Sequence, residues 1–327
     1  MENSLQTAMR IILFGDGAWA TRSLVRLHQS KRWQVVGLVL RLEPSEPTLA
    51  KTARDLSIPI LCPQKINAPE FVEQIRVLAP DLNLSISYNQ ILGLPMIKTA
   101  PLGFVNFHAG KLPFYRGRNV INWALINGET EVGLTAHFVD EGIDTGDIIL
   151  QQTLPVSWTD TYGDVLSRLI DYFPTFVRQT VELLATGDYE RRVQDVSQGT
   201  YFAGREAGDE WLDWGDTSYN LHNKVRAISR PGPGARTTVC DEPIIIWRAF
   251  YDRSSPKYLA TPGQVVGRNV EGVLVKTGDS TLLVQEVELV NHPCMTPRWP
   301  IGTRLGTNPA TILSALLARL KLIGLEC

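Results

Sequence analysis

The chain has 327 residues, of which 44% are hydrophobic and 20% charged, so it can bury a sizeable core in two domains or in one large α/β domain with an appendage. Lys and Arg number 32 against 34 Asp and Glu, a net charge of −2, and nothing in this balance calls for a nucleic-acid partner. The apolar runs, such as Ile11–Phe14, are too short to cross a membrane, and the polar start Met1–Ser4 lacks the pattern of a signal peptide. We therefore expect a cytoplasmic protein with no membrane partner.

The cysteines are too scattered to form a recognisable metal site. Cys62, Cys240, Cys294 and Cys327 include no Cys-x-x-Cys pair, and no histidine cluster accompanies them. They are typical of free thiols in a reducing compartment, and we expect no metal.

A strand, a glycine-rich turn and a helix begin the predicted fold. Residues Met9–Phe14 are apolar and predict a buried strand, and the turn Gly15–Ala20 reads Gly-x-Gly-x-x-Ala before a helix that runs to about Gln29. This turn is half of a dinucleotide-binding fingerprint. In such a site an acidic residue after the second strand binds the ribose, and Glu43 follows the strand Val35–Leu40 at about that position. An NAD-dependent sugar-nucleotide oxidoreductase is therefore one alternative. The signal is weak, because glycines serve any tight turn between a strand and a helix.

Strands and helices then alternate as far as residue 185. The pattern predicts helices at 48–56, 68–78, 119–127 and 162–185 and strands at 58–61, 82–87, 102–107, 133–139 and 148–155. Such alternation is typical of a Rossmann-like, mostly parallel α/β sheet covered by helices on both faces.

The character of the chain changes near residue 201, and we place a domain boundary there, with domains at 1–200 and 201–327. Residues 211–214 form a compact element, residues 218–228 a helix, and short strands follow at 237–240, 244–251, 263–266, 272–276 and 281–290. Short strands punctuated by Gly and Pro predict a small β-barrel. A helix at 310–323 carries one apolar stripe of Ile312, Leu313, Leu316, Leu317 and Leu320, which we expect to pack on the body of the protein.

Two polar clusters within the α/β region carry the chemistry. The strand at 102–107 ends in Asn106 and His108, whose side chains share one face because they lie two residues apart, and a glycine-rich loop follows. Ligands usually bind at this carboxyl edge of an open α/β sheet. Asp144 lies 36 residues after His108, a spacing that suits one crossover helix and one further strand. An amide that stabilises an oxyanion and an imidazole backed by a carboxylate would together suit acyl transfer.

These motifs resemble those of the folate-dependent formyltransferases. The resemblance rests on Asn106-Phe107-His108, Leu112-Pro113, Arg116-Gly117 and Asp144-Thr145-Gly146, and it extends from Met9 to about Gly302. Among the subfamilies, the chain is most similar to enzymes that formylate amino sugars linked to nucleotides. It departs from many relatives at Gly110 and Lys111, where they have Ser and Leu.

The resemblance implies a donor, an acceptor and a set of site residues. The donor would be 10-formyltetrahydrofolate and the acceptor the primary amine of a nucleotide-linked amino-dideoxy sugar, with an OB-like C-terminal domain and a homodimer as further expectations. Asn106 would stabilise the oxyanion, His108 would remove the proton from the amine, and Asp144 would orient His108. The expected folate contacts are Ser87, Tyr88, Asn89, Gln90, Ile91, Leu92, Val139, Asp140 and Gly142. The expected acceptor contacts are Gly15, Asp16, Trp19, Lys111 and Arg116, although Arg116 and Arg118 would also serve to brace their loop.

Other acceptors stay open within the same chemistry. A methionyl-tRNA formyltransferase should carry a basic tail domain, because phosphate contacts dominate tRNA affinity. Residues 205–327 contain 14 Lys and Arg against 13 Asp and Glu, and the loop Arg41–Ala50 lacks a basic insertion. These features speak against methionyl-tRNA as the acceptor. The sequence does little to exclude a hydroxyornithine-type amine as the acceptor. A binding module without catalysis is the remaining alternative.

Overall fold

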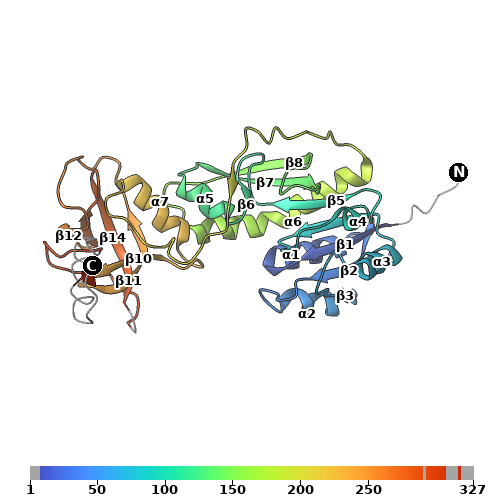
Figure 1. Ribbon diagram of the computed structural model, residues 1–327, viewed down its shortest axis with the longest axis horizontal. Helices are drawn as coiled ribbons and strands as arrows, with labels where there is room; N and C mark the ends of the chain where they lie inside the picture. The colour runs from blue at the N-terminus through green and yellow to red at the C-terminus, as the bar shows by residue number, and fades with distance from the viewer. Residues whose placement is uncertain (1–7, 290–291, 307–315, 318–327) are drawn as a thin grey trace. The chain divides into compact units, whose positions relative to one another are not determined.

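The computed structural model describes residues 8–289, 292–306 and 316–317. The chain forms two compact units (Figure 1). The N-terminal unit comprises Met1–Ile121, Glu131–Val156 and Leu166–Gly204, and the C-terminal unit comprises Asn122–Thr130, Ser157–Val165 and Arg205–Cys327. The chain therefore contributes two short stretches of its first half to the C-terminal unit.

A seven-stranded sheet forms the centre of the N-terminal unit, with the strand order β3-β2-β1-β4-β5-β7-β8. The strands from β3 to β5 pair in parallel, whereas β5–β7 and β7–β8 pair antiparallel. The prediction of a mostly parallel α/β sheet is confirmed. The strands are β1 (Met9–Gly15), β2 (Trp33–Leu40), β3 (Ile60–Leu61), β4 (Leu82–Ile86), β5 (Phe104–His108), β7 (Glu131–Phe138) and β8 (Ile148–Pro155).

Helices connect these strands near the predicted positions. They are α1 (Gly17–His28), α2 (Thr48–Asp55), α3 (Pro69–Val77), α4 (Leu94–Ile97), α5 (Val120–Ile126) and α6 (Tyr162–Thr186). Two short strands, β6 (Arg116–Gly117) and β9 (Tyr201–Phe202), pair in parallel outside the main sheet. Helix α4 and strands β6 and β9 were not predicted, because elements this short show no measurable periodicity. Within the described residues, no helix combines the length and the apolarity needed to cross a bilayer.

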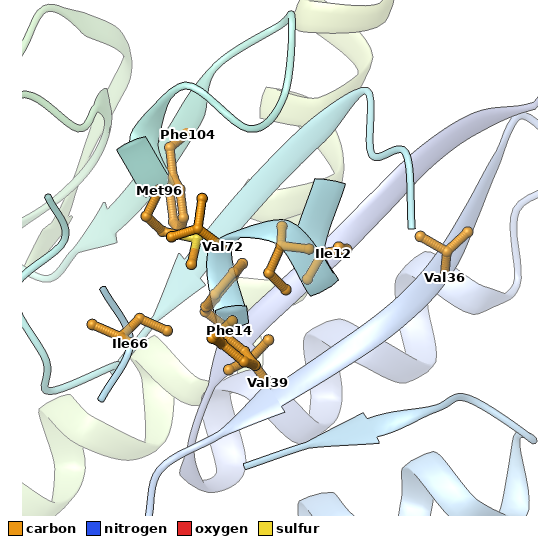
Figure 2. Packing of buried hydrophobic residues seen from close by; sticks show 10 residues of the cluster. Ile12, Phe14, Val36, Val39, Ile66, Val72, Met96 and Phe104 are labelled. Carbon is orange, nitrogen blue, oxygen red and sulfur yellow. The ribbon is translucent and has the colours of Figure 1, made fainter. Parts of the chain in front are cut away.

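The two faces of the sheet have separate apolar cores. On one face, Ile12 and Phe14 of β1 and Phe104 of β5 pack with Val72 of α3 and Met96 of α4 (Figure 2). On the other face, the ring of Phe107 meets the rings of Phe173 and Phe176 from α6. Side chains alternate along a strand, so Asn106 and His108 lie on the same face as Phe104, beyond the apolar cluster.

The direction of β7 differs from the expected crossover. We predicted a crossover helix between His108 and Asp144, which would place the next strand parallel to β5. Instead, β7 runs antiparallel to β5, and Asn106 lies opposite His137 while His108 lies opposite Thr135. The physical reason is that α5 has only seven residues, which is short for the crossover helix that a parallel connection needs.

The C-terminal unit is a five-stranded antiparallel sheet in the order β10-β11-β14-β13-β12. Its strands are β10 (Ala235–Val239), β11 (Glu242–Phe250), β12 (Val265–Asn269), β13 (Gly272–Lys276) and β14 (Thr281–Leu289). The predicted C-terminal domain of short β-strands is confirmed, and its strands pair antiparallel.

Both edge strands of this sheet are joined by one short segment. Arg304 bridges Gln264, next to β12, and Leu305 bridges Val239 of β10, as in a small closed barrel. The unit also contains α7 (Ser218–Ile228), which Thr217 caps by accepting a hydrogen bond from the backbone N–H of Asn220. The predicted helix at 310–323 lies outside the described residues except for Leu316 and Leu317, which are helical and exposed.

Candidate active site

Asn106, His108 and Asp144 lie together at the end of β5, all within the N-terminal unit. The Nδ2 atom of Asn106 lies 3.3 Å from Asp144 Oδ1, and His108 Nδ1 lies 3.6 Å from Asp144 Oδ2. The backbone N–H of Gly117, from the loop after His108, donates to Asp144 Oδ2 at 2.9 Å. The carboxylate therefore connects the end of the strand to the loop that follows it.

A tight turn presents the Asp144 carboxylate. Asp144 has a φ of 56°, in the left-handed region that non-glycine residues seldom occupy. Asp140 stabilises this turn, since its Oδ1 accepts hydrogen bonds from the Gly142 N–H at 3.1 Å and from Thr145 Oγ1 at 2.7 Å. The Asp140 side chain, which we expected to contact folate, is thus engaged in shaping the turn.

Burial and charge set the protonation states of the pair. Burial lowers the pKa of His108, and Asp144 offsets only part of this effect. Burial by itself would raise the pKa of Asp144, but His108, His137 and the Gly117 N–H together hold the pKa of that carboxyl well below its ordinary value. At neutral pH the site therefore contains a neutral imidazole beside an ionised carboxylate.

The hydrogen bonds of His108 indicate which nitrogen can accept a proton. Nε2 lies 2.6 Å from the carbonyl oxygen of Tyr115, and a carbonyl only accepts, so Nε2 carries the hydrogen. The lone pair is then on Nδ1, which faces Asp144. A proton taken up at Nδ1 would lie next to a negative charge, and this arrangement suits a general base.

The glycine at position 110 allows this contact. A Cβ atom there would lie 2.5 Å from both His108 Nε2 and the Tyr115 oxygen. The departure from the Ser of many relatives therefore has a steric reason in this chain. The other departure, Lys111, is half exposed and forms an ion pair with Glu131.

His137 is a further member of the site that the sequence analysis missed. It is 3% exposed, and its Nδ1 donates to the carbonyl oxygen of the next residue, Phe138, at 2.8 Å. Its Nε2 is then an acceptor, 3.1 Å from Asn106 Nδ2. Both N–H groups of Asn106 thus have acceptors, one on His137 and one on Asp144. The antiparallel register, which sets His137 opposite Asn106, is the signal that would have revealed this contact.

The two segments expected to line the folate pocket meet at one apolar cluster. Tyr88, Leu92 and Val139 are partly buried and all pack against the core shown in Figure 2. The Tyr88 hydroxyl is buried without a hydrogen-bond partner among the described residues, and burial raises the pKa of Tyr88 to about 12. Apolar side chains with a buried hydroxyl suit the aromatic body of a folate.

The rest of this segment is more exposed. A hollow of about 550 Å³ adjoins it, lined by Lys65, Ile66, Asn67, Ala68, Gln90 and Ile91. Ser87 and Asn89 are exposed, Ile91 is 74% exposed, and Gln90 accepts a hydrogen bond from the Ile66 N–H at 2.9 Å.

The glycine-rich turn expected to contact the acceptor is largely engaged in packing. Asp16 is 2% exposed, accepts hydrogen bonds from the Ser45 N–H at 3.0 Å, and pairs with Arg41 at 3.2 Å. A Cβ at Gly15 would lie 2.8 Å from the Ala20 Cβ, and the Trp19 ring packs at 4.7 Å from that of Phe173. A buried carboxylate at this turn would repel a pyrophosphate, which speaks against the NAD alternative.

Arg116 lies on β6, in the segment that follows His108. Its Nη2 donates to the Val196 carbonyl at 3.4 Å, and its Nε is buried without a partner among the described residues. Arg118, two residues on, is exposed. Arg116 thus contributes to bracing the loop. Within the residues described by the structure, no group of three or more His, Cys, Asp or Glu is placed to hold a metal ion.

An α/β sheet with a cluster of polar side chains at the carboxyl end of one strand is typical of an α/β enzyme. The chain matches the Formyl transferase family over residues 9–180 and the Formyl transferase, C-terminal domain, over residues 206–300. It belongs to this family and is a folate-dependent formyltransferase.

Three similar proteins illustrate the range of the family. The methionyl-tRNA formyltransferase of Ruminiclostridium cellulolyticum is 32% identical over 300 residues, which are 89% of this chain and 95% of the relative. The structure of WlaRD, a sugar 3N-formyl transferase, matches with a TM-score of 0.67 at 20% identity and covers 87% of this chain and 99% of its own. The N-formyltransferase from Helicobacter canadensis matches with a TM-score of 0.66 at 18% identity and covers 85% and 99%. The two structural matches show a shared fold.

Proposed function

We propose that this enzyme transfers the formyl group of 10-formyltetrahydrofolate to a primary amine, with Asn106, His108 and Asp144 as its catalytic residues. The observation that carries the proposal is the position of one ionised carboxylate, which lies within 3.6 Å of both the His108 imidazole and the Asn106 amide. Tyr88, Leu92 and Val139 would hold the folate beside them.

The reaction moves one proton and exchanges one C–N bond. The amine nitrogen attacks the formyl carbon, and Nδ1 of His108 accepts the proton that the nitrogen loses. The resulting imidazolium lies next to Asp144, which stabilises its charge. When the tetrahedral species collapses, the bond from the formyl carbon to N10 breaks, and the same proton passes to N10 of the leaving tetrahydrofolate.

The negative oxygen of the tetrahedral species needs a hydrogen-bond donor. Asn106 has two N–H groups, and its contact with Asp144, at 3.3 Å, is longer than its contact with His137, at 3.1 Å. The N–H facing Asp144 is therefore the one that would turn toward the oxyanion, while His137 holds the other. His137 thereby keeps the nitrogen side of the amide directed at the reacting group.

Methionyl-tRNA is the acceptor supported by sequence similarity, although the sequence analysis placed it second. The relative from Ruminiclostridium cellulolyticum carries this function in its name and matches nearly the whole of both chains. Further relatives of the same name match at 31–33% identity.

A nucleotide-linked amino sugar is the second candidate, and charge favours it. Residues 205–327 have a net charge of only +1, and the loop Arg41–Ala50 holds one basic residue, Arg41, against two acids, Glu43 and Glu46, and so has no basic insertion. A protein that neutralises several tRNA phosphates needs a clear excess of Lys and Arg. The similar fold of two sugar N-formyltransferases is consistent with this candidate.

One experiment distinguishes the two candidate acceptors. The purified enzyme is given 10-formyltetrahydrofolate with either methionyl-tRNA or a panel of amine-bearing nucleotide sugars, and tetrahydrofolate release is followed at 50 mM and 200 mM salt. Turnover with methionyl-tRNA that falls steeply with salt supports the first acceptor. Turnover with a nucleotide sugar and none with methionyl-tRNA supports the second. No tetrahydrofolate release with any amine, including hydroxyornithine, contradicts the proposed function.

A further inference from the structure

Gln194 lies beside the Asp144 turn, although 50 residues separate the two in the chain. A pair of backbone hydrogen bonds brings its segment there: the Ile148 N–H donates to Arg192 O at 2.8 Å, and the Arg192 N–H donates to Ile148 O at 3.0 Å. Gln194 follows this bridge by two residues and is 9% exposed, whereas its neighbours Val193 and Asp195 are exposed. It is therefore the residue of this segment that points into the unit.

The Gln194 amide holds two carbonyl groups of the turn. Its Nε2 donates to Asp144 O at 3.1 Å and to Gly146 O at 2.6 Å. This orientation of the amide is the only one that fits, because exchanging nitrogen and oxygen would set Oε1 against two carbonyl oxygens. It leaves Oε1 buried without a partner among the described residues. A buried acceptor without a partner is unfavourable. The two hydrogen bonds that Nε2 donates are therefore formed at a cost in stability at Oε1.

These bonds act on the backbone of the residue whose carboxylate organises the site. Asp144 has a left-handed backbone, a conformation that persists only where the surroundings hold it. Asp140 restrains the turn through the Gly142 N–H and the Thr145 hydroxyl, on the two sides of Asp144, whereas Gln194 binds the carbonyls of residues 144 and 146 themselves. Without Gln194, the carbonyls of residues 144 and 146 would lose their side-chain hydrogen bonds.

We infer that Gln194 is a positioning residue for formyl transfer, which sets the distance between the Asp144 carboxylate and the His108 imidazole. The inference rests on the proposed function. In this role Gln194 acts through Asp144. If its amide is removed, the turn relaxes, Asp144 moves away from His108, and the imidazolium formed during the reaction loses its counter-charge.

The effect on pH dependence has a definite sign. Asp144 raises the pKa of His108. His108 must be neutral to accept a proton, so turnover rises with pH through the His108 pKa. Moving Asp144 away lowers that pKa, and the acid limb of the profile of kcat against pH therefore shifts to lower pH.

The test compares Gln194→Met with Gln198→Met. Methionine has nearly the same length as glutamine but donates no hydrogen bond, and Gln198 is an exposed residue of the same segment whose side chain donates to Asp195. For Gln194→Met we expect kcat to fall roughly 10- to 100-fold, KM for both substrates to change less than about threefold, and the acid limb to shift. Gln198→Met should match the wild type. Unchanged kcat, or an unchanged acid limb, in Gln194→Met overturns the inference.

A double-mutant cycle separates positioning from a general loss of structure. In the Asp144→Asn background, Gln194→Met should cost little further turnover, because its route of action is already absent. A full additional loss would mean that Gln194 acts on folding alone, and the inference would fail. If Gln194→Met does not fold, Gln194→Glu, which sets a carboxylate against the two carbonyls, is measured in the same cycle. If Asp144→Asn itself retains wild-type turnover, the proposed function fails instead.

Discussion

Two buried histidines, His108 in the N-terminal unit and His222 in the C-terminal unit, lie in opposite electrostatic surroundings. His108 faces the carboxylate of Asp144. His222 is 2% exposed and has cations around it: Arg226 lies near it, and the Arg253 guanidinium lies 4.0 Å from the ring of Trp158, which packs on His222. Burial, together with Arg226 and Arg253, lowers the pKa of His222 to about 4.

The difference shows what makes a buried histidine suitable for chemistry. Both ring nitrogens of His222 lie near backbone carbonyls, 3.2 Å from Ala249 O and 3.0 Å from Trp158 O, which would favour an added proton, but burial and the neighbouring cations outweigh them. His108 keeps one nitrogen on a carbonyl and turns the other toward a carboxylate, so an added proton is stabilised. Burial is common to both residues, and the sign of the facing charge distinguishes the proposed base, His108, from His222.

The largest expected effect is the loss of the charge that faces His108. Asp144→Asn keeps the shape of the side chain but removes the counter-charge of the imidazolium, and we expect turnover to fall by roughly 10³ to 10⁴. The measurement is single-turnover formyl transfer at pH 7.5, with folate binding followed separately. Near-normal turnover in this variant would mean that the charge facing His108 does not matter for the reaction, and the contrast drawn with His222 would be wrong.

Loss of the amide donor should have the next largest effect. Asn106→Ala removes the proposed oxyanion contact, and by comparison with other oxyanion donors we expect kcat to fall by about 10² to 10³. Donor and acceptor KM should change little, because the contact forms in the transition state. Steady-state kinetics with both substrates varied checks this, and a change in KM alone would contradict the role.

The third prediction concerns stability in acid. The pKa of His222 is lowered in the folded state, so the stability associated with its neutral form is complete above the unfolded-state pKa of about 6.5 and is lost as the pH falls toward 4. Relative to His222→Gln, the wild type should lose up to roughly 3 kcal/mol of unfolding free energy between pH 7 and pH 4. Urea unfolding at intervals across this range provides the measurement.

Turnover of His222→Gln at pH 7.5 completes this test. His222 shares no hydrogen bond with the catalytic residues in the part of the chain that the structure describes, so we expect turnover within about threefold of the wild type. A loss comparable to that of Asp144→Asn would mean that both histidines belong to the reaction, and the comparison would be wrong.

The smallest effect is expected at Lys111. Its ion pair with Glu131 joins side chains that are 49% and 38% exposed, and such surface pairs contribute about 0–1 kcal/mol. Lys111→Ala should therefore change the unfolding free energy by less than about 1 kcal/mol and the acceptor KM by less than about twofold. A tenfold rise in acceptor KM would instead support the acceptor contact expected from the position of Lys111 beside His108.

Local patterns predicted most elements of both units. The strand at 148–155 and the helix at 218–228 match β8 and α7 residue for residue. The prediction succeeded there because apolar periodicity and turn residues act over a few positions. The strand predicted at 263–266 is shifted relative to β12, Val265–Asn269, because a two-residue hairpin turn with Gly272 in β13, and not apolar spacing, sets its end.

The acceptor turn shows a limit of the same reasoning. Gly15, Asp16 and Trp19 occupy a turn that commonly binds phosphates, and the sequence offered no means to tell that Asp16 would be buried. Its partners, Arg41 and Ser45, come from the loop after the next strand. An ion pair across that distance in the chain depends on how two loops meet at the sheet edge.

The sequence by itself determined the family, the fold class and the three residues on which the proposed chemistry depends, since each lies in a short motif with its own turn residues. Only the tertiary structure decided what surrounds them. The antiparallel register of β7 brings His137 to Asn106, and the bridge between Ile148 and Arg192 brings Gln194 to the Asp144 turn. Strand direction and long-range bridges arise from packing of the whole unit, so no local pattern of residues encodes them.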